Sequence, residues 1–241
     1  MKLKLNFKKP PKHPTIIEGF PGFGLIGTIT TEFLIEQLGA KQIGTIKADE
    51  ANPLVAIHQG KLVHPMGIFY DEKTNLVILH VVTPASGIEW QMGEAVVKMA
   101  EQLKAKEIIA IEGVGSPTAG AAEKHDVFYY VNNDKNKNKL EKINVKQLKE
   151  GIILGVTGAL LVEVEKEHSL TCIFAETASN MPDSKASAKV IEVLDKYLGL
   201  NIDYKPLMKQ AQQFEDKLKT IMVQSQTASQ ESEKKKLSYV G

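Results

Sequence analysis

The feature that most constrains the fold is a glycine-rich stretch near the start of the chain, Gly19-Phe20-Pro21-Gly22-Phe23-Gly24-Leu25-Ile26-Gly27. Within it, Gly22, Gly24 and Gly27 have the spacing G-x-G-x-x-G, and the stretch lies between a short apolar run at 15–17 and a segment with helical spacing. In dinucleotide-binding proteins, such glycines form a strand-to-helix turn whose backbone contacts a pyrophosphate. The spacing therefore predicts a strand-turn-helix unit, with or without a bound cofactor.

Other features of the chain favour a structural role for these glycines. Pro21 favours extended backbone just before the turn. Asp49 and Glu50 follow the next strand-like run, at 42–47, where a ribose-binding carboxylate would lie. The chain then continues into hairpins, so that a second crossover helix is missing and the nucleotide-binding half is not completed. We therefore interpret the glycines as a tight turn that permits close packing, and we expect no cofactor.

Apolar periodicity predicts a single α/β domain. Strand-like runs at 54–58, 62–63, 67–70 and 76–82 are separated by short turns, as in antiparallel hairpins, and further strands are predicted at 107–112, 127–131 and 169–176. Helical spacing predicts helices over 28–38, 87–103 and 184–198. The polar segment 132–139 is expected to be a surface tip, and the lysine-rich segment 135–149 a solvated loop. Residues 1–203 should form a three-layer α/β/α domain with a mixed sheet.

The composition excludes several classes of protein. The net charge is +1 and all 30 basic residues are lysines, which disfavours phosphate clamps and sequence-specific DNA recognition. The single cysteine, Cys172, excludes an intramolecular disulfide and lies in an apolar run, where we expect a small buried hydrophobe. Neither a secretory signal nor a membrane-spanning run is evident, so we expect a cytoplasmic protein that binds neither nucleic acid nor membrane.

No residue pattern predicts nucleophilic catalysis, since the G-x-S-x-G elbow is missing. His58 and His64 flank a predicted hairpin and could face each other, but a third metal ligand is lacking. His80 lies in an apolar run and is expected to be a hydrogen-bonded core histidine. We therefore expect no catalytic residue and no metal site.

Three carboxylates at predicted strand ends are the remaining candidates for a site. Glu18, Glu112 and Glu176 could line a cleft at the carboxyl edge of the sheet, or they could cap helices and loops. A pocket with several acids and no arginine suits a sugar, a base or an amine better than a phosphate. An alternative function is therefore a nucleotide- or small-molecule-binding enzyme that uses the cleft around Gly22–Gly27, Glu112 and Gly113–Ser116.

The C-terminal part of the chain differs from the rest. A heptad-like seam over a predicted helix at 204–223 could mediate self-association or lie on the chain's own domain, and consists of Leu207, Ala211, Phe214, Leu218 and Ile221. Residues 224–241 are polar and predicted to be a flexible tail. The tail ends in an apolar cluster that is either a partner-binding motif or an unconstrained terminus, and consists of Leu237, Tyr239, Val240 and Gly241.

Several segments, in the right order over about 15–220, resemble the proteasome assembly chaperone 2 family, which is best represented in archaea. They are the glycine turn, the second glycine segment 151–161, the blocks 172–177, 181–183 and 186–188, and the segment 199–203. The resemblance implies a phosphorylase/hydrolase-like α/β fold, no enzymatic activity, and self-association into a homo-oligomer, with a ring as one form.

Some members of that family are proposed to bind proteasome α-subunits through a C-terminal tripeptide in which a tyrosine is penultimate. In this chain Tyr239 is third from the end and Ser238 precedes it, so we expect the offset to weaken such binding. The resemblance thus implies a non-catalytic assembly chaperone or scaffold whose partners are proteasome α-subunits or a homologous chaperone subunit.

Overall fold

The computed structural model describes residues 2–5, 10–49, 55–58, 61–115, 125–164, 168–177, 181–205 and 207. Within them, a nine-stranded mixed sheet has the order β1-β3-β6-β7-β2-β8-β11-β9-β10. Its strands are β1 (Lys2–Leu5), β2 (Thr15–Gly19), β3 (Lys41–Lys47), β6 (Met66–Asp71), β7 (Leu76–Val81), β8 (Glu107–Gly115), β9 (Val127–Val131), β10 (Lys146–Gln147) and β11 (Leu170–Thr177). A separate hairpin joins β4 (Ala56–His58) and β5 (Lys61–Val63).

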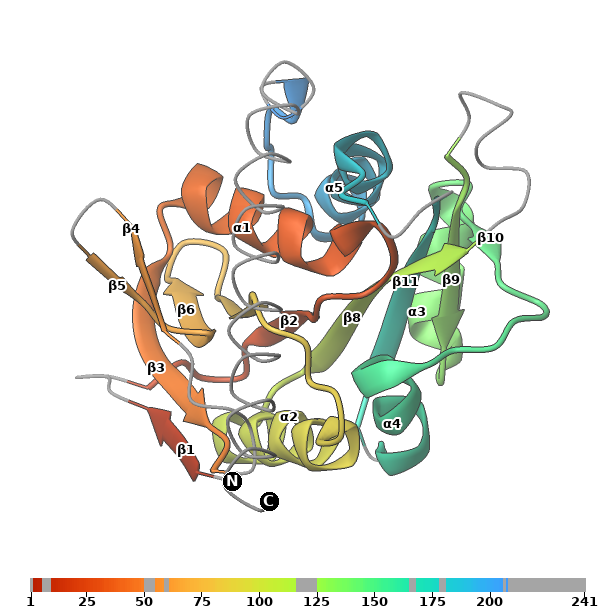
Figure 1. The fold of residues 1–241 in the computed structure, drawn as a ribbon. Helices are drawn as coiled ribbons and strands as arrows, with labels where there is room; N and C mark the ends of the chain where they lie inside the picture. Colours follow the sequence, from red (N-terminus) through yellow and green to blue (C-terminus); the bar gives the residue numbers. More distant parts are fainter. Residues whose placement is uncertain are drawn as a thin grey trace.

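Helices cover both faces of the sheet (Figure 1). They are the short 3-10 helix η1 (Phe23–Leu25), α1 (Ile26–Leu38), α2 (Glu89–Leu103), α3 (Asp134–Lys142), α4 (Gly155–Glu163) and α5 (Ser184–Leu198). One apolar core lies between the sheet and helices α2 and α4, and the other between the sheet and helices α1 and α5. The predicted three-layer α/β/α fold with a mixed sheet is confirmed.

The four central strands β7, β2, β8 and β11 run parallel to one another. They are mostly apolar because each is buried on both faces, and alternate apolar residues enter the two cores. In β8, for example, Ile108 and Ala110 face α2 and α4, whereas Ile109 and Ile111 face α1 and α5. The outer strands β1, β3 and β6 continue the sheet in antiparallel pairs. The predicted hairpins are confirmed in the pairs β4–β5 and β6–β7.

Some local predictions were wrong. The expected polar tip and loop at 132–149 contain helix α3, whose N-cap Asn133 accepts a hydrogen bond from the Asn136 N–H at 2.9 Å. Leu140 is fully buried and Asn136 nearly so, because α3 packs on β9 and the α1/α5 core. The short strands β1 and β10 were also missed. In the β4–β5 hairpin, His58 pairs with Lys61 and so does not lie opposite His64.

Candidate functional site

A cleft of about 320 Å³ opens at the carboxyl ends of the central strands β2 and β8. The chain leaves β2 toward β3 on one side of the sheet and leaves β8 toward β9 on the other. Such a reversal of direction is where open α/β sheets form ligand-binding crevices. The cleft is lined by Phe20, Pro21, Gly22, Phe23, Pro84, Ala85, Ser86, Glu89, Glu112, Gly113, Val114, Gly115 and 152–156.

The glycine turn forms one wall of the cleft and packs against its own domain. A Cβ atom on Gly22 would lie 1.9 Å from Glu112 Oε1, and one on Gly27 would lie 2.8 Å from the Ile111 carbonyl oxygen. Gly24 has φ of 64°, which favours glycine, and its carbonyl accepts a hydrogen bond from the Asp183 N–H at 2.9 Å. The glycines therefore allow close packing of η1 and α1 on the sheet, as predicted, and the Glu112 carboxyl group of β8 lies against Gly22.

Glu112 lies at the floor of the cleft. It follows Ala110 on the face of β8 that is covered by α2 and α4, and only 9% of the residue is exposed. Its Oε1 accepts a hydrogen bond from the Gly113 N–H at 3.1 Å, and its Oε2 accepts one from the Thr157 hydroxyl at 3.3 Å. Burial raises its pKa to about 7, and the two hydrogen bonds oppose that rise. Glu112 can therefore gain or lose a proton near neutral pH.

A second carboxyl group lies beneath Glu112, outside the cleft. Glu18 of β2 and Cys172 of β11 both pair with Ala110, so the three residues form one row across the sheet. Glu18 is fully buried, and no hydrogen bond to either carboxyl oxygen is formed among the described side chains. Burial and the nearby Glu112 raise the pKa of Glu18 well above its usual value, and the backbone at Phe20 opposes this in part. Burial therefore favours the protonated form of Glu18.

The mouth of the cleft is apolar and exposed. Ile152 and Leu154, which precede α4, are 87% and 67% exposed, and Phe23 of η1 is 42% exposed. We call these three residues the apolar rim. Trp90, in the first turn of α2 beside the cleft-lining Glu89, is also more than half exposed. Clustered large apolar side chains on a surface are typical of interaction sites.

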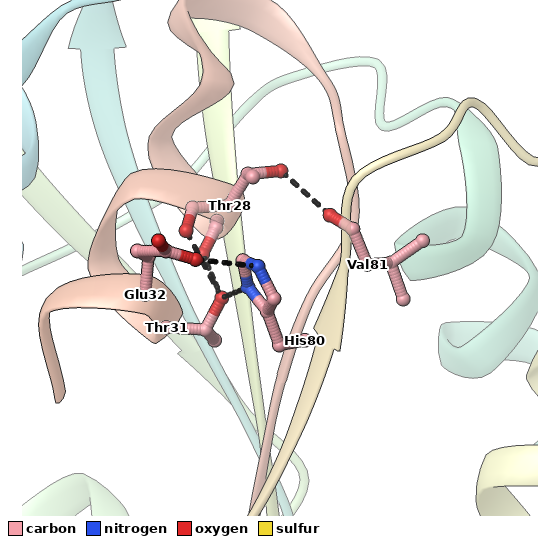
Figure 2. A network of polar contacts seen from close by, with 6 residues as sticks. Thr28, Thr31, Glu32, His80 and Val81 are labelled. Carbon is pink, nitrogen blue, oxygen red and sulfur yellow. Dashed lines mark hydrogen bonds and ion pairs between the residues drawn. The ribbon is translucent and has the colours of Figure 1, made fainter. Parts of the chain in front are cut away.

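Helix α1, which follows the glycine turn, is fixed to β7 by buried polar contacts (Figure 2). His80 Nε2 lies 2.8 Å from Glu32 Oε2, and His80 Nδ1 lies 2.9 Å from the Thr31 hydroxyl. One helical turn earlier, the Thr28 hydroxyl donates to the Val81 carbonyl at 3.0 Å. These contacts set the position of α1 and hence of the turn, and they confirm that His80 is a hydrogen-bonded core histidine.

Another buried polar cluster lies at the opposite edge of the parallel strands. Glu107 Oε1 accepts hydrogen bonds from Asn136, Thr171 and Tyr197 at 2.7, 2.6 and 2.7 Å. Burial raises the pKa of Glu107, and the hydrogen bonds from Thr171 and Tyr197 oppose the rise. The cluster joins β8, β11, α3 and α5, so its evident role is to hold the helices on the sheet.

Of the three predicted cleft carboxylates, only Glu112 lines the cleft; Glu18 lies beneath it and Glu176 lies away from it. Gly113 and Gly115 line it as predicted, whereas Ser116 is outside the described residues. The apolar rim was missed, because an exposed isoleucine or leucine in a sequence looks like a core residue. Cys172 is fully buried and burial raises its pKa, as expected of a buried hydrophobe.

The predicted C-terminal sites are largely outside the described residues. Leu207 is described, and it is buried in the α1/α5 core next to residues such as Ile202. Ala211, Phe214, Leu218 and Ile221 are outside, as are Leu237, Tyr239, Val240 and Gly241. Among the residues that are described, no three His, Cys, Asp or Glu side chains are grouped as metal ligands, and no helix is long and apolar enough to cross a membrane.

Comparison with known proteins identifies the family. PbaA of Pyrococcus furiosus, described as an archaeal homologue of proteasome-assembly chaperone, is 28% identical with a TM-score of 0.83, over 95% of this chain and 99% of PbaA. A protein of Methanocaldococcus jannaschii, described as uncharacterised, is 28% identical over 99% of this chain and 96% of its own length. PbaB of P. furiosus, described as an archaeal proteasome activator, shares the fold at 23% identity, with a TM-score of 0.74 over 91% of this chain and 98% of PbaB. The family model of the PAC2 family matches residues 16–222, and the chain therefore belongs to the PAC2 family.

Proposed function

We propose that this chain is a non-catalytic, oligomeric proteasome assembly chaperone that acts in the cytoplasm. The observation that carries the proposal is the similarity to PbaA over nearly the full length of both chains, in sequence and in fold. The partners are proteasome α-subunits or a homologous chaperone subunit. We assign the main contact surface to the folded domain, where large apolar side chains such as Ile152 and Leu154 are exposed.

The apolar rim supports a role in protein binding. Ile152 and Leu154 precede α4 and project large apolar side chains into solvent, and Val162 of α4 is 72% exposed. A side chain of this kind gains about 1.5–3 kcal/mol when it is fully buried, so a partner that covers the rim gains substantial binding energy. We therefore assign the partner-binding surface of the domain to the apolar rim.

The cleft supports a non-catalytic role through its glycine turn. Gly22 and Gly27 pack on the domain itself, and the Glu112 carboxyl group lies against Gly22, where it would repel a pyrophosphate. Beneath the cleft, the Cys172 thiol and the Glu18 carboxyl group could in principle serve as a nucleophile and an acid. Both residues are completely buried and so are out of reach of a substrate. These contacts favour a scaffold over a nucleotide-dependent enzyme.

Native mass spectrometry of the full chain mixed with free proteasome α-subunits tests the proposal. We expect a complex that survives deletion of residues 237–241 in weakened form and is lost in the double variant Ile152→Asp/Leu154→Asp. Ile57→Asp is the matched control, because Ile57 is 77% exposed on the β4–β5 hairpin, away from the cleft. If the wild-type chain forms no complex, the proteasome role is wrong, although a persisting homo-oligomer would still indicate a scaffold for another partner.

Self-association is tested separately by light scattering. A truncation at residue 203 would remove Leu207, which belongs to the domain core. A smaller species could then result either from a less stable fold or from lost self-association. We therefore choose the double variant Phe214→Asp/Leu218→Asp in the predicted seam, and we expect a smaller species with unchanged thermal stability. An unchanged oligomer would place the self-association surface elsewhere, and a monomeric wild-type chain would contradict the oligomeric part of the proposal.

A further inference from the structure

The charge of the cleft selects its ligand. Glu112 lies at the floor and Glu89 at the edge, and the lining residues that the structure describes include neither lysine nor histidine. A phosphate or a carboxylate would therefore enter a site whose described charged groups are all carboxyl groups. A positively charged hydrogen-bond donor is the complementary ligand.

Glu112 has the capacity to accept such a donor. A carboxylate has about four acceptor positions. The described contacts of Glu112 use two of them, in hydrogen bonds from Gly113 and Thr157 that are both longer than 3.0 Å. The remaining positions are available from the cleft, since Glu112 is one of its lining residues.

The walls of the cleft specify what carries the positive charge. Beside the carboxyl groups, most of the lining is apolar and includes Phe20, Val114, Ile153 and Val156. An aliphatic chain can lie along such walls while its charged end reaches Glu112. The apolar rim surrounds the entrance, and a small free amine would leave Ile152 and Leu154 exposed, whereas a protein partner would cover them.

We propose that the cleft binds the side chain of a lysine presented by a protein partner. The ammonium group contacts Glu112, the aliphatic stem lies along the apolar walls, and the partner's neighbouring apolar residues cover the rim. The inference rests on the proposed function only in that the occupant is a protein. It adds a specific recognition element, a lysine flanked by apolar residues.

The direct test is titration of the full-length chain with the peptide acetyl-Leu-Lys-Leu-amide, followed by NMR or calorimetry. The same peptide with norleucine in place of lysine lacks only the ammonium group, and n-pentylamine lacks the flanking apolar residues. We expect the lysine peptide to bind at least tenfold more tightly than the norleucine peptide, because a hydrogen bond to a charged group is strong. It should also bind more tightly than n-pentylamine. Equal affinity for the two peptides would overturn the proposal, and equal affinity for n-pentylamine would assign the cleft to a free amine.

Variants locate the contact. Glu112→Gln keeps the shape of the side chain and should weaken binding of the lysine peptide at least tenfold. Glu94→Gln is the matched control, because Glu94 is also an acid that forms an ion pair, with Lys98 on the exposed side of α2, but it does not line the cleft. Unchanged affinity in Glu112→Gln, with that variant folded by circular dichroism, would overturn the proposal.

The pH dependence provides an independent readout. Because the pKa of Glu112 is about 7, the carboxylate form increases roughly tenfold between pH 6 and pH 8, and affinity for the lysine peptide should rise by a similar factor. In the described part of the chain, Glu18, Cys172 and Glu89 are the other titratable groups around the site. A pH dependence that persists in Glu112→Gln would therefore assign the effect to one of them and overturn the role of Glu112. None of these titrations uses proteasome subunits, so their failure is distinguishable from failure of the proposed function.

Discussion

Substitution of Gly113 by alanine tests the close packing of the glycine turn on β8. A Cβ atom at this position would lie 2.0 Å from the Phe23 carbonyl oxygen and 2.8 Å from the Phe23 carbonyl carbon. Real Cβ contacts are essentially never under 3.0 Å, so the η1 backbone would have to withdraw by about 1 Å, the difference between 3.0 and 2.0 Å. No rotamer change can relieve the clash, because it joins a Cβ atom to the backbone carbonyl of Phe23 and involves no rotatable side chain.

Overpacking of a core costs about 1–3 kcal/mol, and contact with backbone places Gly113→Ala at about 3 kcal/mol. For a chain of this size, that loss lowers Tm by roughly 6–12 °C. Gly115→Ala is the matched control on the same strand, because its Cβ would lie within 4 Å of none of the residues that the structure describes. We expect it to stabilise the fold by about 0.5 kcal/mol through the unfolded state.

The assay is equilibrium urea unfolding of both variants and the wild type at one protein concentration, since self-association would otherwise alter the apparent stability. The expected order of unfolding free energy is Gly115→Ala, wild type, Gly113→Ala. A Gly113→Ala variant within 1 kcal/mol of the wild type would refute the close approach of η1 to β8. So would equal losses in the two variants, which would indicate a general requirement for glycine in this strand.

Three further predictions concern buried polar groups. The raised pKa of Glu112, about 7 against an unperturbed value of about 4.3, means that the folded state holds a proton that the unfolded state releases, so stability should fall by up to about 3 kcal/mol as pH rises from 4.5 to 7. Urea unfolding across this range should show a smaller fall in Glu112→Gln; an identical pH profile would contradict the assignment. His80→Ala removes the contacts to Thr31 and Glu32 and should cost about 2–3 kcal/mol by thermal or urea unfolding, whereas a loss below 0.5 kcal/mol would show that they do not fix α1. The Cys172 thiol is fully buried and its pKa is raised, so a thiol reagent such as DTNB should react with it only in denaturant; rapid reaction of the native protein would indicate local opening of β11.

Elements with strong local signals were predicted from the sequence almost to the residue. Helix α5 was expected over 184–198 and is found there, with Gly199 in the left-handed conformation at its C-terminus. Its apolar spacing, its Asp183 N-cap and its terminal glycine all favour one structure. Strand β8 was predicted over 107–112 from its β-branched run, and in the structure it continues for three more residues to Gly115.

Helix α3 shows where local signals fail. The segment from Asp134 to Lys142 is almost entirely polar, and its sequence resembles a solvated loop. Two residues decide the outcome. Leu140 enters the α1/α5 core, and Asn136 completes the hydrogen bonds of Glu107, a partner 29 positions earlier in the chain. Contacts over such separations are not encoded in local periodicity.

The glycine turn combines both cases. The sequence by itself determined a strand-turn-helix unit and, with the blocks downstream, the family, because glycine spacing and apolar periodicity act over a few residues. Only the tertiary structure decided what the glycines pack against. Gly22 lies on Glu112 and Gly113 lies on Phe23, pairs brought together when β2 and β8 become neighbours in the sheet. The apolar rim is likewise a tertiary property, since the exposure of Ile152 and Leu154 depends on how α4 and the segment before it pack on the sheet.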